Sequence, residues 1–442
     1  MAPPPLFGTR PAPHAASERI RVFLVDDSPV ALLLLQRLLS LDGKIQVVGT
    51  ARNGREAMVL LKASQPDVII TDYHMPVMDG LALVKAMMER FPRPILVVSS
   101  AVGADQEAAF ALLQAGAVDL FPKPQGLGNM KEVSAQLAQK IHMLAGVVVI
   151  SRRDLSTPAA FPATPGTDTP PARPAQPSNG NGASDTGACA PTTPGQTPGG
   201  ATGASTTGAS TWSAAAAGAA ILAPAPRRGY LGRVVSAHSI APRSVPSRVM
   251  AIGASTGGPQ ALQTIFSALP ASFPCPILCV QHISHGFLDG LVEWLNRCCR
   301  LSVQVAEHGE KARAGVIYFA PQDKHLEIDA RCCLLHSQAP PVDGHRPSVT
   351  ALFDSVARSL GEQGVGVLLT GMGGDGGEGL LEMARRGAAT IAQDEASSII
   401  FGMPRQAIEI GAAQYVLPLD QVAPALERLA LPPLPPALSP KK

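Results

Sequence analysis

The stretch IGASTGGPQAL, residues 252–262, holds a serine between glycines directly after an apolar run. Gly253, Ser255 and Gly257 satisfy the pattern G-x-S-x-G, in which a sharp strand-to-helix turn exposes a serine hydroxyl for attack on a carbonyl carbon. A phosphate-binding P-loop would need a lysine that this stretch lacks. The pattern is weak by itself, because glycine and serine are common in structural turns. A serine nucleophile also requires a base and a group that orients the base.

Two candidate partners for Ser255 stand at the ends of other apolar runs. His282 ends CPILCVQH, and Asp375 lies in the loop GMGGDGGEG that follows GVGVLLT. If these runs are parallel strands, the three side chains meet at one edge of the sheet. Their order along the chain, Ser, His, Asp, differs from that of the α/β-hydrolases. Three more histidines are rival bases, although none ends so clear a strand: His285, His325 and His345.

The glycine-rich loop also supports a different function. Gly371, Gly373 and Gly376 fit G-x-G-x-x-G, and Asp394 ends the next apolar run, near the position of a ribose-binding acid. On this loop alone, a dinucleotide-binding enzyme and an esterase are about equally supported.

A second group of reactive side chains lies near the N-terminus. Apolar runs end in Asp26 and Asp27, in Asp72, in Ser99 and in Lys123. Clustered carboxylates repel one another unless a cation is present, and Mg²⁺ prefers oxygen ligands. A carboxylate can also attack phosphorus and form an aspartyl-phosphate. Single strand-end aspartates often only cap turns, but this combination with a lysine favours a phosphorylation site.

The elements that position these residues alternate regularly. Residues 19–146 contain five apolar segments, each followed by an amphipathic helical pattern, beginning with IRVFLVDD and SPVALLLLQRLLSL. In the first helix, Ser28 is the expected N-cap and Pro29 the first helical residue. Residues 247–431 alternate in the same way. Short buried strands between helices predict α/β domains with parallel sheets covered on both faces.

The segments outside these two domains have other compositions. Residues 147–246 are rich in Pro, Gly, Ala, Ser and Thr and poor in large aliphatic residues, so they cannot bury enough apolar surface to offset the entropy of ordering. We predict a disordered linker there, a disordered N-terminus over 1–18 and a proline-rich tail over 432–442.

Composition excludes several classes of protein. The net charge is +2 and charged residues make up 16%, with no basic stripe that would indicate nucleic-acid binding. No apolar run reaches membrane-spanning length, and the proline-broken N-terminus lacks the apolar core of a signal peptide. The seven cysteines include no C-x-x-C pair, so we expect thiols rather than a zinc site. These features predict a cytoplasmic location without membrane insertion.

At the strand ends named above, residues 20–145 resemble a response-regulator receiver domain. The resemblance implies a flavodoxin-like fold with a five-stranded parallel sheet. It assigns Asp72 as the phospho-acceptor, Asp26 and Asp27 with Asp72 as the Mg²⁺ carboxylates, Ser99 as the switch hydroxyl and Lys123 as the phosphate-pairing lysine. Position 120, often an aromatic residue that rotates in such receivers, is Leu120 here.

The second domain resembles the catalytic domain of chemotaxis protein-glutamate methylesterase/glutamine deamidase. GASTGG, VQH, HRPSV, TGMGGDGG and AQDEASSIIFGMP match that family's motifs in order. The resemblance implies a doubly wound, mostly parallel α/β domain with Ser255 as nucleophile, His282 as base and Asp375 as its orienter. The backbone at Thr256 and Met372 would form the oxyanion hole. Thr350 stands where the family often has Asp.

Together the two resemblances imply a phosphorylation-activated esterase. It would demethylate glutamate methyl esters and deamidate glutamines on chemoreceptors, and a chemotaxis histidine kinase would phosphorylate it. Mg²⁺ would act only at the receiver, and the esterase site would need no cofactor. The alternatives are a receiver-controlled dinucleotide-binding enzyme and a non-catalytic signalling module.

Overall fold

The computed structural model describes residues 7–9, 19–99, 104–124, 129–149, 234–240, 245 and 247–430. Most of the predicted linker, residues 150–233, lies outside the described residues, as do nearly all of the predicted N-terminal segment and the predicted tail from residue 432.

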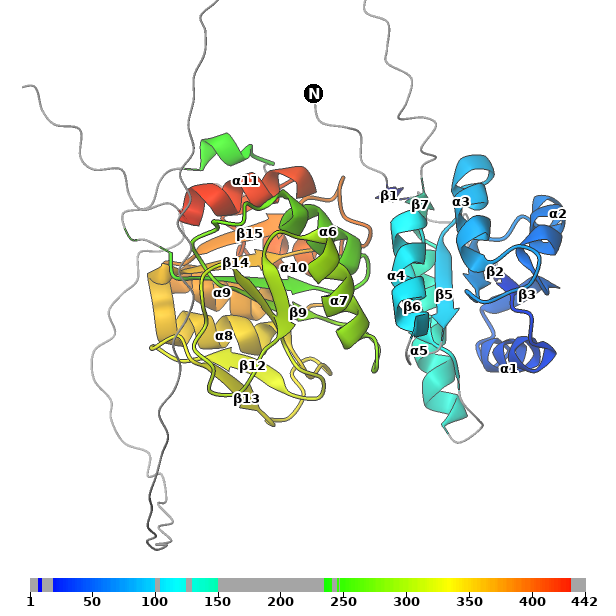
Figure 1. The fold of residues 1–442 in the computed structure, drawn as a ribbon, viewed down its shortest axis with the longest axis horizontal. Helices are drawn as coiled ribbons and strands as arrows, with labels where there is room; N and C mark the ends of the chain where they lie inside the picture. The colour runs from blue at the N-terminus through cyan, green and yellow to red at the C-terminus, as the bar shows by residue number, and fades with distance from the viewer. Residues whose placement is uncertain are drawn as a thin grey trace, which may run out of the picture. The chain divides into compact units, whose positions relative to one another are not determined.

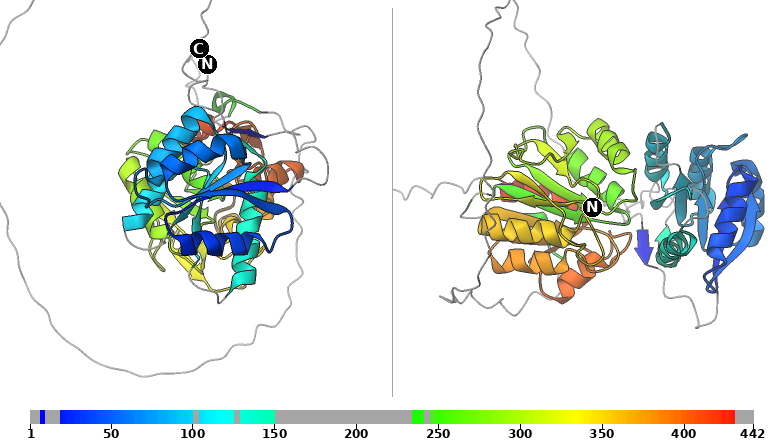
Figure 2. Two further views of the ribbon diagram at one scale, coloured as in Figure 1. Left: turned by 90° about the vertical axis from the view of Figure 1, so that its right-hand side faces the viewer. Right: turned by 90° about the horizontal axis from the view of Figure 1, so that it is seen from below.

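The N-terminal domain is a five-stranded parallel sheet with strand order β3-β2-β4-β5-β6, which confirms the predicted fold (Figure 1). Its strands are β2 (Ile20–Val25), β3 (Ile45–Ala51), β4 (Val68–Thr71), β5 (Ile95–Ser99) and β6 (Asp119–Pro122). Its helices are α1 (Pro29–Leu39), α2 (Gly54–Ser64), α3 (Gly80–Arg90), α4 (Ala104–Ala115) and α5 (Met130–Leu144). Helices cover both faces of this sheet (Figure 2).

Local sequence signals set where these helices begin. Ser28 Oγ accepts a hydrogen bond from the N–H of Ala31 at 3.3 Å, and Pro29 is the first residue of α1, as predicted. Asn53 and Asp79 cap α2 and α3 in the same way. Each cap satisfies an N–H group that has no partner inside its helix.

The C-terminal domain contains a seven-stranded parallel sheet with order β10-β11-β9-β8-β14-β15-β16. Its strands are β8 (Val249–Ala254), β9 (Ile277–Gln281), β10 (Ser302–Val305), β11 (Val316–Phe319), β14 (Gly364–Leu368), β15 (Ala389–Gln393) and β16 (Tyr415–Leu417). The α-helices are α6 (Gly258–Ala268), α7 (Leu288–Cys298), α8 (Val349–Leu360), α9 (Gly377–Arg385), α10 (Met403–Glu409) and α11 (Leu419–Ala430), and the short helix η3 (Gly361–Gln363) follows α8. The doubly wound prediction is confirmed.

Strand β8 shows how one sheet serves two cores. Met250 and Ile252 point into an apolar cluster with residues of α6 and α11, whereas Val249 and Ala251 point into a cluster with residues of α8 and α9. Successive side chains of a strand point to opposite faces, and all of these are fully buried. The near-continuous apolar strands therefore reflect a sheet with helices on both faces, as Figure 2 shows.

Several elements were not anticipated from the sequence. The pair β12 (His325–Ile328) and β13 (Leu334–Ser337) forms an antiparallel hairpin. A two-stranded ribbon joins β1 (Phe7–Thr9), inside the predicted disordered N-terminus, to β7 (Val147–Val149), inside the predicted linker. The short helix η2 (Ala237–Ser239) also lies in the predicted linker range, and the buried Ile240 accepts a hydrogen bond from Arg428 of α11 through its carbonyl oxygen. Ala237 and Ile240 of the segment are buried despite the linker-like composition around them.

None of the described helices is both long and apolar enough to cross a bilayer. The six cysteines in the described residues are free thiols, as expected.

Candidate active site

The predicted acidic site forms at the carboxyl edge of the N-terminal sheet. Asp26 follows β2, Asp72 follows β4, and Lys123 follows β6. The Lys123 Nζ lies 2.8 Å from a carboxylate oxygen of Asp26 and 2.8 Å from one of Asp72. Ser99 ends β5, and its carbonyl oxygen accepts the N–H of Lys123 at 2.8 Å. The structure therefore brings the predicted carboxylates, hydroxyl and amine to one edge.

The acidic site contains more carboxylates than positively charged side chains. Asp26, Asp27 and Asp72 offer oxygen atoms that all lie within 4.8 Å of one another, and Asp26 and Asp72 are buried. Burial raises the pKa of Asp72, and the nearby Asp26 adds to the rise, while Lys123 opposes it. Burial would lower the pKa of Lys123, but the two carboxylates raise it overall, so its ammonium form is stabilised. Three carboxylates with one ammonium fit a hard divalent cation such as Mg²⁺.

In the C-terminal domain, the strand order places the second group of predicted residues together. Strands β9, β8 and β14 are neighbours, with Ala254 opposite Gln281 and Gly253 opposite Leu368. The chain winds from β8 toward β9 on one side and toward β14 on the other, so the order reverses at β8. Ser255, His282 and the loop with Asp375 follow these strands directly. Such a reversal is the usual ligand-binding position of an open α/β sheet.

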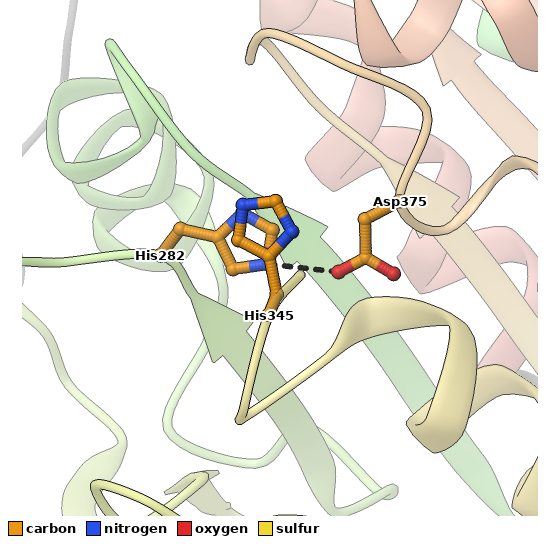
Figure 3. A group of neighbouring side chains, drawn as sticks. All are labelled: His282, His345 and Asp375. Carbon is orange, nitrogen blue, oxygen red and sulfur yellow. Dashed lines mark hydrogen bonds and ion pairs between the residues drawn. The ribbon is translucent and has the colours of Figure 1, made fainter. Parts of the chain in front are cut away.

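His282 and Asp375 form a hydrogen-bonded pair (Figure 3). The His282 Nε2 lies 2.8 Å from Asp375 Oδ2, although the two residues are 93 positions apart in the sequence. Because Nε2 faces a carboxylate, it carries a proton in the neutral ring, and Nδ1 then has the free lone pair. Nδ1 is buried and has no hydrogen-bond partner among the described residues. Only Nδ1 is available to accept a proton from a nucleophile.

The carboxylate of Asp375 is fully buried and docks on the N-terminus of α8. Its Oδ1 accepts from the hydroxyl of Ser348 at 2.7 Å and from the N–H of Thr350 at 2.9 Å, and Oδ2 accepts from the N–H of Val349 at 2.7 Å. Burial would raise the pKa of Asp375, but the bonds from His282, Ser348 and Thr350 outweigh it and hold the pKa well below its usual range. Asp375 is therefore an ionised partner for His282.

Gln281 joins the turn of Ser255 to the strand of His282. Its side-chain amide nitrogen donates to the carbonyl oxygen of Ser255 at 2.7 Å and to that of His282 at 2.8 Å. The N–H of His282 in turn donates to the carbonyl oxygen of Ala254 at 2.9 Å. These bonds fix the two segments relative to each other.

Gly371 brings the glycine-rich loop onto Ser255. A β-carbon at Gly371 would lie 2.6 Å from Cβ of Ser255, so no larger residue fits there. Within the described residues, the backbone N–H groups of Thr256 and Met372 have no hydrogen-bond partner, and Met372 is 40% exposed. Two unpaired donors beside a serine could bind a developing oxyanion.

Comparison with known proteins agrees with this architecture. The family model "CheB methylesterase" matches residues 250–426, and "Response regulator receiver domain" matches residues 22–134. A protein-glutamate methylesterase/protein-glutamine glutaminase of Geobacter metallireducens is 36% identical over 419 residues, covering 93% of this chain and 99% of the relative. Relatives of the same name from Syntrophus aciditrophicus and Moorella thermoacetica are 35% and 37% identical, with 98% of each relative covered.

This chain belongs to the protein-glutamate methylesterase/protein-glutamine glutaminase family. It joins a receiver domain to a methylesterase domain, and its alignment with the relative from Geobacter metallireducens covers 93% of this chain. Family membership disfavours both alternatives, the dinucleotide-binding enzyme and the non-catalytic module.

The structure gives the G-x-G-x-x-G motif and Asp394 a structural role in place of dinucleotide binding. Asp394, the candidate ribose ligand, is buried, and its Oδ1 accepts from the N–H of Ser397 at 3.0 Å and from its hydroxyl at 2.5 Å. Gly376 packs against Leu368 and Val349, where a β-carbon would collide with both. Gly371 and Gly376 therefore allow close packing, Gly373 adopts a positive φ of 89°, and Asp394 closes a local turn.

The rival histidines are also separated by their surroundings. His285 is 78% exposed in its side chain and lies 3.5 Å from Asp323. His325 is buried, with Nε2 3.1 Å from the carbonyl oxygen of Pro340 and Nδ1 accepting the N–H of Ser348 at 3.2 Å. His345 lies against the ring of His282. Of these four histidines, only His282 forms a hydrogen bond with Asp375.

Three residues of this site were missed or left unassigned by sequence reasoning. Nothing in the sequence around Gln281 or Ser348 marks the bonds that they make to the site. Thr350, which departs from the common family residue, accepts the N–H of Gly376 through its hydroxyl at 2.7 Å. Thr350 therefore bonds to Asp375 through its N–H and to Gly376 through its hydroxyl.

Proposed function

We propose that this chain is a phosphorylation-activated serine esterase that hydrolyses γ-methyl esters of glutamate side chains on chemoreceptors and deamidates glutamines. The observation that carries the proposal is the ionised Asp375 bonded to His282 at the sheet edge where Ser255 emerges. The names of its relatives support the substrate class. Residues 19–146 act as the receiver and residues 247–431 as the esterase, with residues 234–240 packing onto the latter.

In the first half of the reaction, Ser255 Oγ attacks the ester carbonyl carbon while Nδ1 of His282 accepts the hydroxyl proton. The positive ring that results is stabilised by Asp375 through Nε2. Collapse of the tetrahedral intermediate breaks the bond to the methoxy group, which leaves as methanol with the proton from Nδ1. The acyl group then remains as an ester of Ser255.

In the second half, water attacks the acyl-enzyme and gives its proton to His282. The bond to Ser255 Oγ breaks, the proton returns to the serine, and a glutamate carboxylate is released. A glutamine substrate has the same carbonyl with ammonia as leaving group, so the same side chains carry out deamidation. The backbone N–H groups of Thr256 and Met372 stabilise the oxyanion in both halves.

Regulation rests on the acidic site of the receiver. A chemotaxis histidine kinase is the proposed phosphodonor and Asp72 the acceptor. Asp26, Asp27 and Asp72 would hold Mg²⁺, which neutralises charge on the transferred phosphoryl group when bound. Lys123, already 2.8 Å from Asp72, pairs with the new phosphoryl group, and Ser99 lies at the adjacent strand end.

Methanol release from a methylated receptor fragment tests the proposal directly. The full chain with Mg²⁺ and acetyl phosphate should release methanol, and Ser255→Ala should lose nearly all activity while remaining folded. Ser267→Ala, at an exposed serine on α6, is the matched control and should keep wild-type activity. Residual turnover of Ser255→Ala within tenfold of the wild-type rate would reject Ser255 as the nucleophile.

The regulatory part is tested separately. Asp72→Asn should stay at the basal rate when acetyl phosphate is added, whereas the wild-type chain should be stimulated. Equal stimulation of both proteins would reject Asp72 as the acceptor without affecting the assignment of the esterase residues.

A further inference from the structure

The proposed reaction leaves one histidine beside the active site without a role. The ring of His345 lies over the ring of His282, with ring centroids 4.0 Å apart and ring planes only 4° from parallel. Figure 3 shows the two rings face to face, and of these two rings only that of His282 is hydrogen-bonded to Asp375. One face of the proposed base is therefore covered by a second imidazole.

The fold holds His345 in this position from both sides. The N–H of His345 donates to the carbonyl oxygen of Val342 at 2.9 Å, and the N–H of Val342 donates to the carbonyl oxygen of His345 at 3.1 Å, which closes a tight turn. His325 bonds to the carbonyl oxygen of Pro340 on one side of this turn and to the N–H of Ser348 on the other. The turn is thus pinned to the hairpin and to the N-terminus of α8.

Electrostatics favour a neutral ring at this position. Burial lowers the pKa of His345, and the nearby His282 lowers it further. His282 must become positively charged during the proposed reaction, and a second positive ring 4.0 Å away would oppose that step. A neutral ring presents its electron-rich face instead, which favours the charged state of His282.

A shared metal ion is a poor explanation of the same cluster. Ligand atoms of His282, His345 and Asp375 lie within 4.8 Å of one another. However, imidazole binds a metal through a lone pair in the plane of its ring, and two parallel stacked rings direct these lone pairs into separate planes. Asp375 already accepts four hydrogen bonds.

We propose that His345 is a positioning residue for the base. Its flat ring covers one face of His282 and holds that ring in the plane where Nε2 meets Asp375 and Nδ1 is left for Ser255. The role requires an aromatic ring and no proton transfer at His345. This inference rests on the proposed function.

The test compares His345→Ala with His345→Phe in the full chain. Phenylalanine keeps a flat ring but has no nitrogen, so it separates stacking from proton transfer. His345→Ala should lower kcat for methanol release by roughly 10- to 100-fold, with KM changed by less than about threefold, because small displacements of a catalytic group are costly. His345→Phe should restore kcat to within about threefold of wild type. His285→Ala, at an exposed histidine, is the control and should be unchanged.

A second readout separates this inference from the proposed substrate. The rate at which a fluorophosphonate labels Ser255 reports activation of the serine without any ester substrate. The labelling rate should fall in His345→Ala and recover in His345→Phe. If the wild-type chain releases no methanol but the labelling rates follow this pattern, the proposed substrate is rejected and the positioning role stands. Thermal unfolding of each variant identifies any loss caused by misfolding.

Three results would overturn the positioning role. His345→Phe that is folded but as slow as His345→Ala would mean that the imidazole nitrogens act in the chemistry. His345→Ala with wild-type labelling would mean that the ring contributes nothing. Inhibition of the wild-type chain by added Zn²⁺ that disappears in His345→Phe would make His345 a metal ligand instead.

Discussion

The side-chain amide of Gln281 donates a hydrogen bond to the backbone carbonyl oxygen of Ser255 at 2.7 Å. The same nitrogen donates to the carbonyl oxygen of His282 at 2.8 Å, so one buried amide connects the turns that carry the proposed nucleophile and base. The close approach needs Gly258, where a β-carbon would lie 1.9 Å from Oε1 of Gln281.

We predict that Gln281→Met lowers both stability and kcat. Methionine has a similar length but no donor, so the carbonyl oxygen of His282 loses its partner and that of Ser255 loses one of two. Losing a buried partner lowers the free energy of unfolding by about 1–3 kcal/mol. Urea denaturation and methanol release measure the two effects, and Gln414→Met, at an exposed glutamine, is the control. Wild-type values for Gln281→Met would show that the connection is not required.

Asp375→Asn should reduce kcat by about 10³-fold or more. The carboxylate oxygens accept from four donors, namely His282, Ser348, Val349 and Thr350. An amide has only one oxygen, so its NH₂ group must face at least one of these donors. In comparable triads such a change leaves the histidine in the wrong tautomer, with losses of this order. Steady-state kinetics with a methylated receptor fragment checks the prediction, and a loss below tenfold would contradict the role of Asp375.

Thr350→Val and Thr350→Ser should differ, because only serine keeps the hydroxyl oxygen that accepts the N–H of Gly376. Valine leaves that N–H without its bond and should lower the free energy of unfolding by about 1–3 kcal/mol. The serine variant should stay close to wild type. The N–H of Thr350 still reaches Asp375 in both variants, so kcat should fall less than in Asp375→Asn. Equal stability of the two variants in chemical denaturation would contradict this account.

Stability below neutral pH should depend on His345. Its pKa is lowered in the folded protein by burial and by His282, and the other charged groups that affect it are Asp375 and Asp343. The unfolded chain therefore binds more protons as the pH falls below about 6.5, the ordinary histidine pKa, and the folded state loses stability until the pH reaches the lowered pKa. His345→Phe has no titrating group at this position and therefore lacks this contribution to the pH dependence of stability. Denaturation from pH 7.5 to 5 should show a smaller decline in His345→Phe than in wild type, and parallel curves would refute it.

Mg²⁺ should stabilise Lys123→Met more than wild type. Removing Lys123 leaves Asp26 and Asp72 buried without their shared cation, so Tm should fall in metal-free buffer. A divalent cation bound by the three carboxylates would restore much of the loss. Tm measured with EDTA and with MgCl₂ checks this, and Lys140→Met, outside the acidic site, is the control. An equal response to Mg²⁺ in Lys123→Met and wild type would argue against a cation at these carboxylates.

The fold class and the positions of the reactive residues follow from local patterns in the sequence. Apolar runs such as those before Asp72, Ser255 and His282 are short, alternate with amphipathic helices and end in polar residues. Such runs form parallel strands, and parallel strands share one carboxyl edge, so the residues at their ends can be assigned to that edge from the sequence. The strand order then decides which of them meet, as β9, β8 and β14 do by being neighbours. Capping by Ser28 was predictable for the same reason, because a cap acts within a few residues.

The tertiary structure alone decided how the side chains at that edge are paired. By residue type alone, any of four histidines could be the base: His282, His285, His325 or His345. Only the packing of α8 and the hairpin against the sheet gives each of them a different partner. Asp375 became an ionised orienter because the N-terminus of α8, some 25 residues away, supplies its donors. The orphan donors of a helix end can reach any segment that packing brings near. Contacts of that kind depend on how whole elements pack, and no local pattern encodes them.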